Sequence, residues 1–256
     1  MDVIKGDTFK WHGKLATTPS TKMMIDLVSP LLVENKKEDF KIIEKILNAN
    51  NLRPVSVLEK LVIASRSVCK INIPGKGMAT GFMISESTLM TNNHVFSESS
   101  EAQGATAIFN YQVDINNNLL QTKMYDIDNS FFFTDQTLDF SIVKVKGNPG
   151  IEWGFNQLSP QPINVGDDVF IIQHPEGMPK QIGMSDNIIA YTDDNVIQYL
   201  TDTMPGSSGS PIYDDMVRLV GIHHSGGWIP EPSNDSTHFR NEGILISAIL
   251  KSIPHY

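Results

Sequence analysis

The sequence has few cysteines and a shortage of positive charge, and each deficit excludes a class of protein. Its one cysteine, Cys69, cannot form an internal disulfide. Lys and Arg number 20 against 29 Asp and Glu, which gives a formal net charge of −9. Binding to phosphates requires clustered Lys and Arg, so we expect no nucleic acid and no anionic membrane as a partner.

Long apolar runs are also missing. No apolar stretch approaches the roughly 20 residues that a bilayer span requires. Lys5, Asp7, Lys10 and His12 interrupt the region where a signal peptide would be apolar. We therefore expect a cytoplasmic location. The residues around Cys69 alternate between apolar and polar, as in a strand, so we expect a thiol in the core.

The chain is 40% hydrophobic and 19% charged, as is typical of a globular protein with a buried core. Its first quarter has a helical pattern. Apolar residues recur at helical spacing over 23–32 and 40–47, and a short helix is expected at 57–63. We interpret residues 1–65 as a helical N-terminal extension.

From Val68 onward the pattern changes to short apolar segments separated by Gly, Asn, Asp and Pro. Many short strands at close spacing indicate an all-β sandwich or barrel. The strands are expected at 68–73, 80–84, 89–91, 105–109, 140–145, 169–172, 188–191, 196–200 and 219–223. A helix is expected at 246–253.

The hexapeptide Gly206–Pro211 carries the most chemical information. Small residues crowded around Ser208 suit a tight turn that exposes its hydroxyl and points backbone N–H groups at an incoming carbonyl. Taken alone, a Ser/Gly run is also typical of a flexible loop. The interpretation of Ser208 as a nucleophile therefore depends on residues elsewhere in the chain.

Two such residues precede it. His94 follows the strand expected at 89–91, and Asp139 stands at the start of the strand expected at 140–145. Taken singly, each has a structural interpretation, as a packed imidazole and as a strand-end cap. Triad chemistry, however, needs a hydroxyl, an imidazole to take its proton and a carboxylate to orient the imidazole.

At this point the sequence resembles the chymotrypsin-like serine peptidases, in particular the disulfide-free bacterial branch of glutamyl endopeptidases and Deg/HtrA proteases. The resemblance covers roughly residues 65–250. The matching segments occur in family order: Gly81–Ile84 with Thr91–Val95, then Leu138–Val143, then Gly206–Pro211, then Val220–His224.

The resemblance implies a mainly β fold of two six-stranded antiparallel β-barrels with the active site between them. The first barrel would span about 66–150 and the second about 160–245. With the C-terminal helix at 246–253, they make up a trypsin-like protease domain over 66–256. Residues 1–65 lie outside the resemblance.

The resemblance also implies roles. Ser208 would attack the scissile carbonyl, His94 would act as general base, and Asp139 would hold the imidazole in one tautomer. The N–H groups of Gly206 and Ser208 would form the oxyanion hole. The substrate would be a protein or peptide, and no cofactor or metal is expected. Ser207 stands where digestive zymogens keep an aspartate, so activation through that ion pair is not expected.

Specificity residues follow from the same family. The glutamyl endopeptidases use a histidine in a Gly-Ile-His segment and a hydroxyl residue five positions before the serine, and this chain has His223 and Thr203 there. Both can donate hydrogen bonds to a carboxylate, so we expect Glu or Asp at P1. The alternative is that His223 only packs. Ser225, Gly226 and Gly227 would form the edge on which substrate lies.

Three roles remain open for residues 1–65: a brace, a lid over the cleft, or an adaptor for a regulatory protein partner. By analogy with intracellular bacterial proteases that carry such extensions, we expect a regulated effector serine endopeptidase. The alternative is a catalytically silent or partner-activated trypsin-like binding module.

Overall fold

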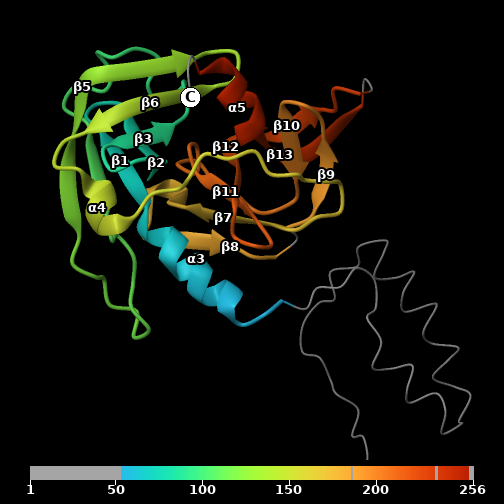
Figure 1. Cartoon of the computed structure of the whole chain (residues 1–256), viewed down its shortest axis with the longest axis horizontal. Coiled ribbons are helices and arrows are strands. Elements are labelled where there is room, and N and C mark those ends of the chain that lie inside the picture. Colours follow the sequence, from blue (N-terminus) through green and yellow to red (C-terminus); the bar gives the residue numbers. More distant parts are fainter. Residues whose placement is uncertain (1–52, 186, 234–235, 254–256) are drawn as a thin grey trace, which may run out of the picture. The chain divides into compact units, whose positions relative to one another are not determined.

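The computed structural model describes residues 53–185, 187–233 and 236–253 (Figure 1). The chain divides into two units between Leu52 and Arg53, and only the second is described below. The helical segments expected at 23–32 and 40–47 lie outside the described residues. None of the described helices has the length and apolarity needed to cross a membrane.

The first half of this unit is a closed antiparallel barrel with the strand order β1-β2-β3-β6-β5-β4. Its strands are β1 (Val68–Ile73), β2 (Gly77–Met83), β3 (Thr88–Thr91), β4 (Thr106–Phe109), β5 (Lys123–Asp135) and β6 (Phe140–Val145). Apolar residues on alternate strand positions fill it, among them the fully buried Ile71, Phe109 and Val143. This confirms the expected first barrel.

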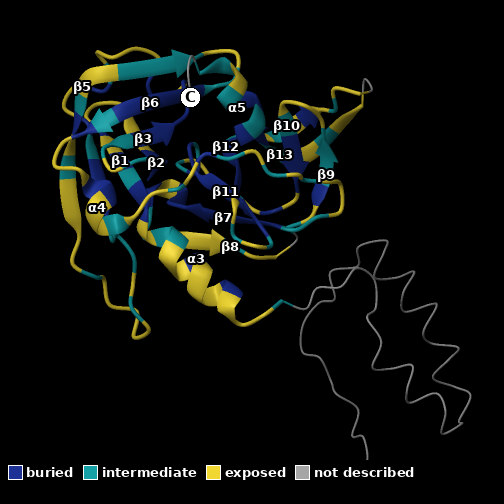
Figure 2. Cartoon of the chain, in the orientation of Figure 1, coloured by how far each residue is buried: buried dark blue, intermediate teal, exposed yellow. Residues whose placement is uncertain are grey.

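The second half is a seven-stranded antiparallel sheet with the order β8-β7-β11-β12-β13-β10-β9. The strands are β7 (Val169–Gln173), β8 (Gln181–Gly183), β9 (Ile189–Thr192), β10 (Val196–Tyr199), β11 (Pro211–Asp214), β12 (Leu219–Pro230) and β13 (Thr237–Leu245). Every residue of β7 and of β11 is buried, as Figure 2 shows.

The starts of β7 and β9, which are far apart in this strand order, are joined by backbone hydrogen bonds. The N–H of Ile189 donates to the carbonyl of Asp167 at 2.9 Å, and the N–H of Val169 donates to the carbonyl of Asn187 at 2.8 Å. The expectation of a mainly β fold is therefore confirmed. The second half differs from the expected six-stranded barrel, because it is a seven-stranded sheet.

The helices are α3 (Ser56–Arg66), α4 (Pro149–Trp153), the 3-10 turn η1 (Pro175–Gly177) and α5 (Ile246–Ser252). On α3, Val57 and Leu61 are buried in the core shared with the second sheet. Arg53 lies 3.0 Å from Asp168 in an ion pair. Residues 53–66 therefore pack as part of the sheet-containing unit.

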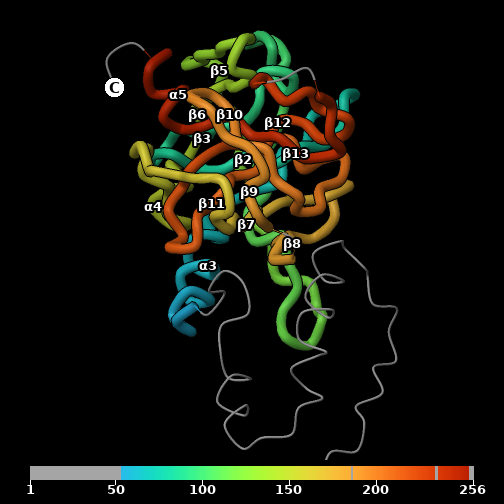
Figure 3. The backbone as a smooth tube through the Cα atoms, turned by 90° about the vertical axis from the view of Figure 1, so that its right-hand side faces the viewer, coloured from blue at the N-terminus to red at the C-terminus, as the bar shows by residue number. Residues whose placement is uncertain are grey.

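Two smaller features complete the fold. The loop between β4 and β5 projects from the barrel in both Figure 1 and Figure 3. Cys69 is fully buried and its thiol points at the carbonyl of Gly81, 3.5 Å away. Burial raises the pKa of this thiol to about 12, so the expected core thiol is confirmed and is chemically inert.

Candidate active site

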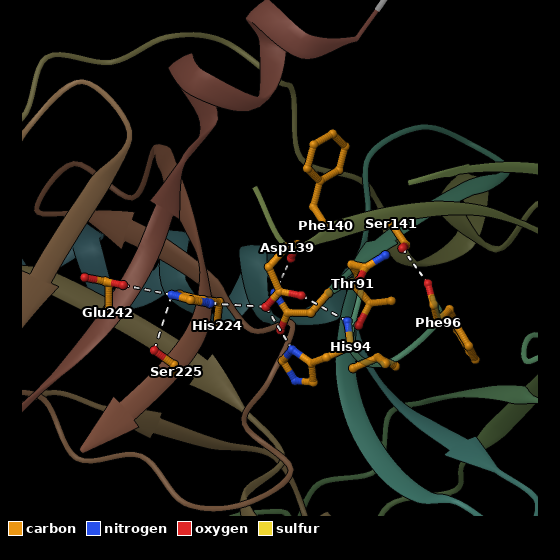
Figure 4. A network of polar contacts seen from close by, with 12 residues as sticks. Thr91, His94, Phe96, Asp139, Phe140, Ser141, His224, Ser225 and Glu242 are labelled. Carbon is orange, nitrogen blue, oxygen red and sulfur yellow. Dashed lines mark hydrogen bonds and ion pairs between the residues drawn. The ribbon is translucent and has the colours of Figure 1, made fainter. Parts of the chain in front are cut away.

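His94 and Asp139 come together at one end of the first barrel. The Nδ1 atom of His94 lies 2.8 Å from Oδ2 of Asp139, and the backbone N–H of His94 donates to Oδ1 at 3.0 Å (Figure 4). His94 sits just past β3, and Asp139 lies between β5 and β6. Because β3 and β6 are paired strands, their ends bring the two residues together.

The surrounding backbone fixes this pair. Asp139 has a φ of 44°, in the left-handed region that non-glycine residues rarely adopt. The Asn92 side chain holds this conformation by donating to the Asp139 carbonyl at 2.9 Å. On the other side, the Ser141 hydroxyl donates to the Phe96 carbonyl at 2.7 Å. The segments that carry the imidazole and the carboxylate are thus tied together twice.

A second histidine reaches the same carboxylate. Nδ1 of His224, on β12, lies 3.2 Å from Oδ2 of Asp139, and its Nε2 lies 2.9 Å from Oε1 of Glu242 on β13. Partial burial raises the pKa of the Asp139 carboxyl, but the hydrogen bonds from His224 and His94 outweigh it and hold the pKa well below its usual range. Asp139 is therefore a carboxylate at neutral pH.

The segment around Ser208 forms two successive tight turns. Ser207 N–H donates to Met204 O and Ser210 N–H donates to Ser207 O, both at 3.0 Å. Gly206 and Gly209 stand at the third position of these turns with φ of 92° and 84°. Glycine is favoured there because a side chain strains such a backbone. The pattern of small residues thus produces the expected tight turn.

Thr80 on β2 attaches this turn to the first barrel. Its N–H donates to Ser208 O at 2.9 Å, and its hydroxyl donates to Gly206 O at 2.8 Å. The same hydroxyl accepts the N–H of His174 at 3.0 Å. A Cβ on Gly209 would come within 2.1 Å of the Thr80 carbonyl. Glycine is therefore required at 209 by this close approach as well as by its φ.

The peptide between Pro205 and Gly206 has a defined orientation. Glu176 lies in η1, and its N–H donates to the Pro205 carbonyl. In a trans peptide the carbonyl and the N–H point in opposite directions, so the Gly206 N–H faces away from Glu176. Within the described part of the chain, the N–H groups of Gly206 and Ser208 donate to no protein acceptor.

The hydroxyl of Ser208 also makes no hydrogen bond within the described residues, including none with His94. The Ser208 turn contacts β12 beside the residue that reaches Asp139. Gly209 N–H donates to the carbonyl of His223, the neighbour of His224, at 3.0 Å. Ser210, by contrast, is fully buried, and its hydroxyl has no hydrogen-bond partner among the described residues.

The residues expected to bind substrate fall into two groups. The Thr203 hydroxyl donates to Oδ1 of Asn241 at 2.7 Å, and a Cβ on Gly226 would meet the same Asn241 oxygen. Thr203, Gly226 and Asn241 therefore lie together. Ser225 and Gly227 pair with β13 next to Gly226.

His223 forms the second group. Its Nδ1 lies 2.7 Å from the hydroxyl of Tyr199, and both residues are buried. Burial, with the charges of His224 and His94, lowers the pKa of the His223 imidazole to about 3. Burial also raises the pKa of Tyr199 well above its usual value. Both groups are therefore neutral at physiological pH.

Several polar residues of this region have no sequence signal of their own. His224 was noted only as part of a family segment, and Glu242, Asn241, Tyr199 and Thr80 were given no role. Their partners are distant in sequence, as with Thr80 and Gly206 or His224 and Asp139. Such contacts become visible only once the strand register is known.

Comparison with known families agrees with this geometry. The family model described as a trypsin-like peptidase domain matches residues 79–222, which is more than half of the 256-residue chain. The chain therefore belongs to the trypsin-like peptidase domain family.

Two relatives match most of this chain at 25 to 32% identity. The chain is 32% identical over 211 residues to the uncharacterized protein y4fB of Sinorhizobium fredii, across 73% of this chain and 32% of that protein. It is 25% identical to exfoliative toxin A of Staphylococcus aureus, across 73% of this chain and 69% of the toxin. The chain thus spans about a third of its Sinorhizobium relative.

A solved structure of a Glu endopeptidase in complex with MPD shares the fold. The TM-score is 0.55 at 20% identity, over 73% of this chain and 87% of that one. At this identity the likeness concerns the fold alone.

Thr80→Val tests the attachment of the Ser208 turn. The substitution preserves shape but leaves the buried His174 N–H and the partly buried Gly206 carbonyl without their partner. We expect the free energy of unfolding, measured by urea denaturation, to fall by about 2 kcal/mol. Thr80→Ser keeps the hydroxyl and should lose less than half of that. Equal stability of the two variants would show that the hydroxyl does not hold the turn.

Proposed function

We propose that this chain is a serine endopeptidase in which Ser208 is the nucleophile, His94 the general base and Asp139 the residue that orients His94. The observation that supports this most strongly is the His94–Asp139 pair on a barrel whose Thr80 also binds the serine turn, in which the Gly206 and Ser208 N–H groups have no acceptor among the described residues. A binding module has no need of that combination.

The geometry favours the required tautomer. With the Asp139 carboxylate 2.8 Å from Nδ1, the His94 ring carries its proton there and leaves Nε2 free to accept one. Ser208 would lose its hydroxyl proton to Nε2 as it attacks the substrate carbonyl. The resulting imidazolium is stabilised by Asp139 and donates the proton to the departing amine. Water then repeats the sequence on the acyl-enzyme.

The developing oxyanion would be bound by the N–H groups of Gly206 and Ser208. The bond from Glu176 to the Pro205 carbonyl supports this, because it holds the Gly206 N–H on the opposite side of the peptide. An already oriented donor stabilises the transition state without reorganisation during the reaction. This favours an active enzyme over one whose oxyanion hole must first be remodelled by a partner.

The substrate would add as a strand along β12. Pairing of β11 with β12 ends at Ile222, whereas Ser225, Gly226 and Gly227 pair only with β13 within the described residues. One backbone edge of this segment is thus left for an extended peptide. Gly227 suits such an approach, since a Cβ there would meet nothing within 4 Å.

We also propose an acidic P1 preference, served by Thr203 and His223. The hydroxyl of Tyr199 lies 2.7 Å from Nδ1 of His223. In this proposal the phenol is the donor, so the imidazole proton is on Nε2, where it would serve as a donor for a carboxylate. Because the pKa of His223 is lowered, that donor is uncharged. Regulation through residues 1–65 in a cytoplasmic effector remains part of this proposal.

Labelling with a fluorophosphonate probe tests the nucleophile. We expect the full chain to react at Ser208, and Ser208→Ala to lose both labelling and about 10⁴-fold or more of its peptide hydrolysis. Ser210→Ala is the matched control and should still label at Ser208. Absence of labelling in the native chain would favour a silent binding module, and labelling only with a partner present would favour a latent enzyme.

A P1-scanning peptide library tests specificity. Glu and Asp should be preferred, and His223→Ala should reduce the ratio of kcat/KM for Glu over Gln by at least tenfold. Tyr199→Phe should lower this ratio less, because the variant keeps the imidazole and only removes the hydroxyl that favours the proton on Nε2. The Glu-over-Gln ratio should not vary between pH 5 and 8 through protonation of His223, because the pKa of His223 is about 3. A native preference for Arg or Leu would overturn the proposal.

A further inference from the structure

The carboxylate of Asp139 lies between two imidazoles from different halves of the fold (Figure 4). Its Oδ2 faces Nδ1 of His94 at 2.8 Å on one side and Nδ1 of His224 at 3.2 Å on the other. His224 stands at an irregularity in β12, where the pairing register with β13 shifts between His223 and Ser225. Because successive side chains of a strand point to opposite faces, His223 and His224 contact different partners, Tyr199 and Asp139.

The far side of His224 meets a second carboxylate. Its Nε2 lies 2.9 Å from Oε1 of Glu242, whose side chain is only 13% exposed. A carboxylate accepts hydrogen bonds, and a neutral imidazole has a single N–H. Both contacts of His224 are satisfied together only when the ring carries two protons.

We propose that His224 is a positioning residue, a cationic bridge between Asp139 and Glu242 that directs the Asp139 carboxylate at His94 and moderates its negative charge. This inference rests on the proposed function of His94 and Asp139. It gives residues of β12 and β13 a direct effect on the proton affinity of His94, which the first barrel carries.

The groups around His224 are consistent with a cation. Asp139 faces it from the loop before β6, and Glu242 faces it from β13. Its neighbour on β12, His223, is neutral, and His94 lies beyond Asp139. Burial lowers the pKa of the His224 imidazole, but the hydrogen bonds to Asp139 and Glu242 outweigh it and raise the pKa to about 9.

Glu242 is itself held in place. Its Oε2 accepts a hydrogen bond from the Gln198 amide at 2.8 Å, and the Arg240 guanidinium donates to the amide oxygen of Gln198 at 3.1 Å. The Ser225 hydroxyl lies 3.3 Å from Nε2 of His224. The carboxylate behind His224 is therefore oriented by residues of β10 and β13 rather than free to rotate.

The arrangement has a consequence for the base strength of His94. Asp139, His224 and Glu242 together carry one net negative charge. Removing the His224 cation leaves two carboxylates, which favour the imidazolium form of His94 over the neutral form. Removing the Glu242 charge has the opposite effect. A role confined to packing would not produce shifts of opposite sign.

The test compares His224→Gln and Glu242→Gln in the full chain. We expect the acidic limb of the kcat/KM–pH profile, where neutral His94 is required, to move up by about half a unit or more in His224→Gln and down by a similar amount in Glu242→Gln. Asp126→Asn removes an exposed charge on β5 and should leave the limb in place. Shifts of the same sign, or none, would overturn the proposal.

A second measurement does not depend on activity. In ¹⁵N-histidine-labelled full chain, both ring nitrogens of His224 should carry protons at pH 7.5, and Glu242→Gln should lower the pKa of the ring by a unit or more. A ring that titrates near 6.5 would contradict the bridge even in an active enzyme. A doubly protonated His224 in a chain that hydrolyses nothing would contradict the proposed function instead.

The pH dependence of the free energy of unfolding also tests whether His224 is cationic in the folded chain. The pKa of His224 is raised in the folded state, so its stabilising effect is complete below about pH 6.5 and is lost as the pH rises through about 9. The urea midpoint of the native chain should therefore exceed that of His224→Gln by more at pH 6 than at pH 10. A pH-independent difference would indicate packing alone and would overturn the cationic bridge.

Discussion

The alignment of two separate sheets is the constraint on which the candidate active site depends, and Thr80 maintains it. From β2 this residue binds the Ser208 carbonyl through its N–H and the Gly206 carbonyl through its hydroxyl, while the same hydroxyl accepts the N–H of His174. The contact with the His174 N–H is buried, so breaking it leaves that N–H without water or protein as a partner, and the contact with Gly206 is partly buried. The serine turn is consequently positioned by the barrel that carries His94 and Asp139, although its own strands belong to the other sheet.

Electrostatics complement this alignment. Burial alone would raise the pKa of Asp139 and lower that of His224. The hydrogen bond between them, with His94 beside Asp139 and Glu242 beside His224, reverses both shifts. The neighbouring His223 has no carboxylate partner among the described residues, and burial keeps it neutral beside Tyr199. One of these two adjacent histidines is therefore neutral and the other cationic. Their surroundings differ because successive side chains of a strand point to opposite faces.

Residues with a local signal were predictable from sequence. Glycines around Ser208, His94 after a strand and Asp139 before one led to the correct fold. Of the three predicted triad residues, His94 and Asp139 are in contact in the structure. Strands β5, β8, β11 and β13 were not predicted. β5 mixes charged and apolar residues and has a register shift between Asp128 and Phe132, which obscures its alternation. Thr80, His224 and Glu242 could not be assigned because their partners are set by strand register, which local patterns do not specify.

The central claim is that Ser208 forms an acyl-enzyme with His94 as its base. The most direct measurement is intact mass spectrometry of the full chain, quenched in acid shortly after mixing with an activated ester substrate, followed by peptide mapping. The account predicts one added acyl group on Ser208 that disappears on further incubation at neutral pH, and very slow acylation in His94→Ala. An acyl group on another residue, or equally fast acylation of Ser208 without His94, would contradict it.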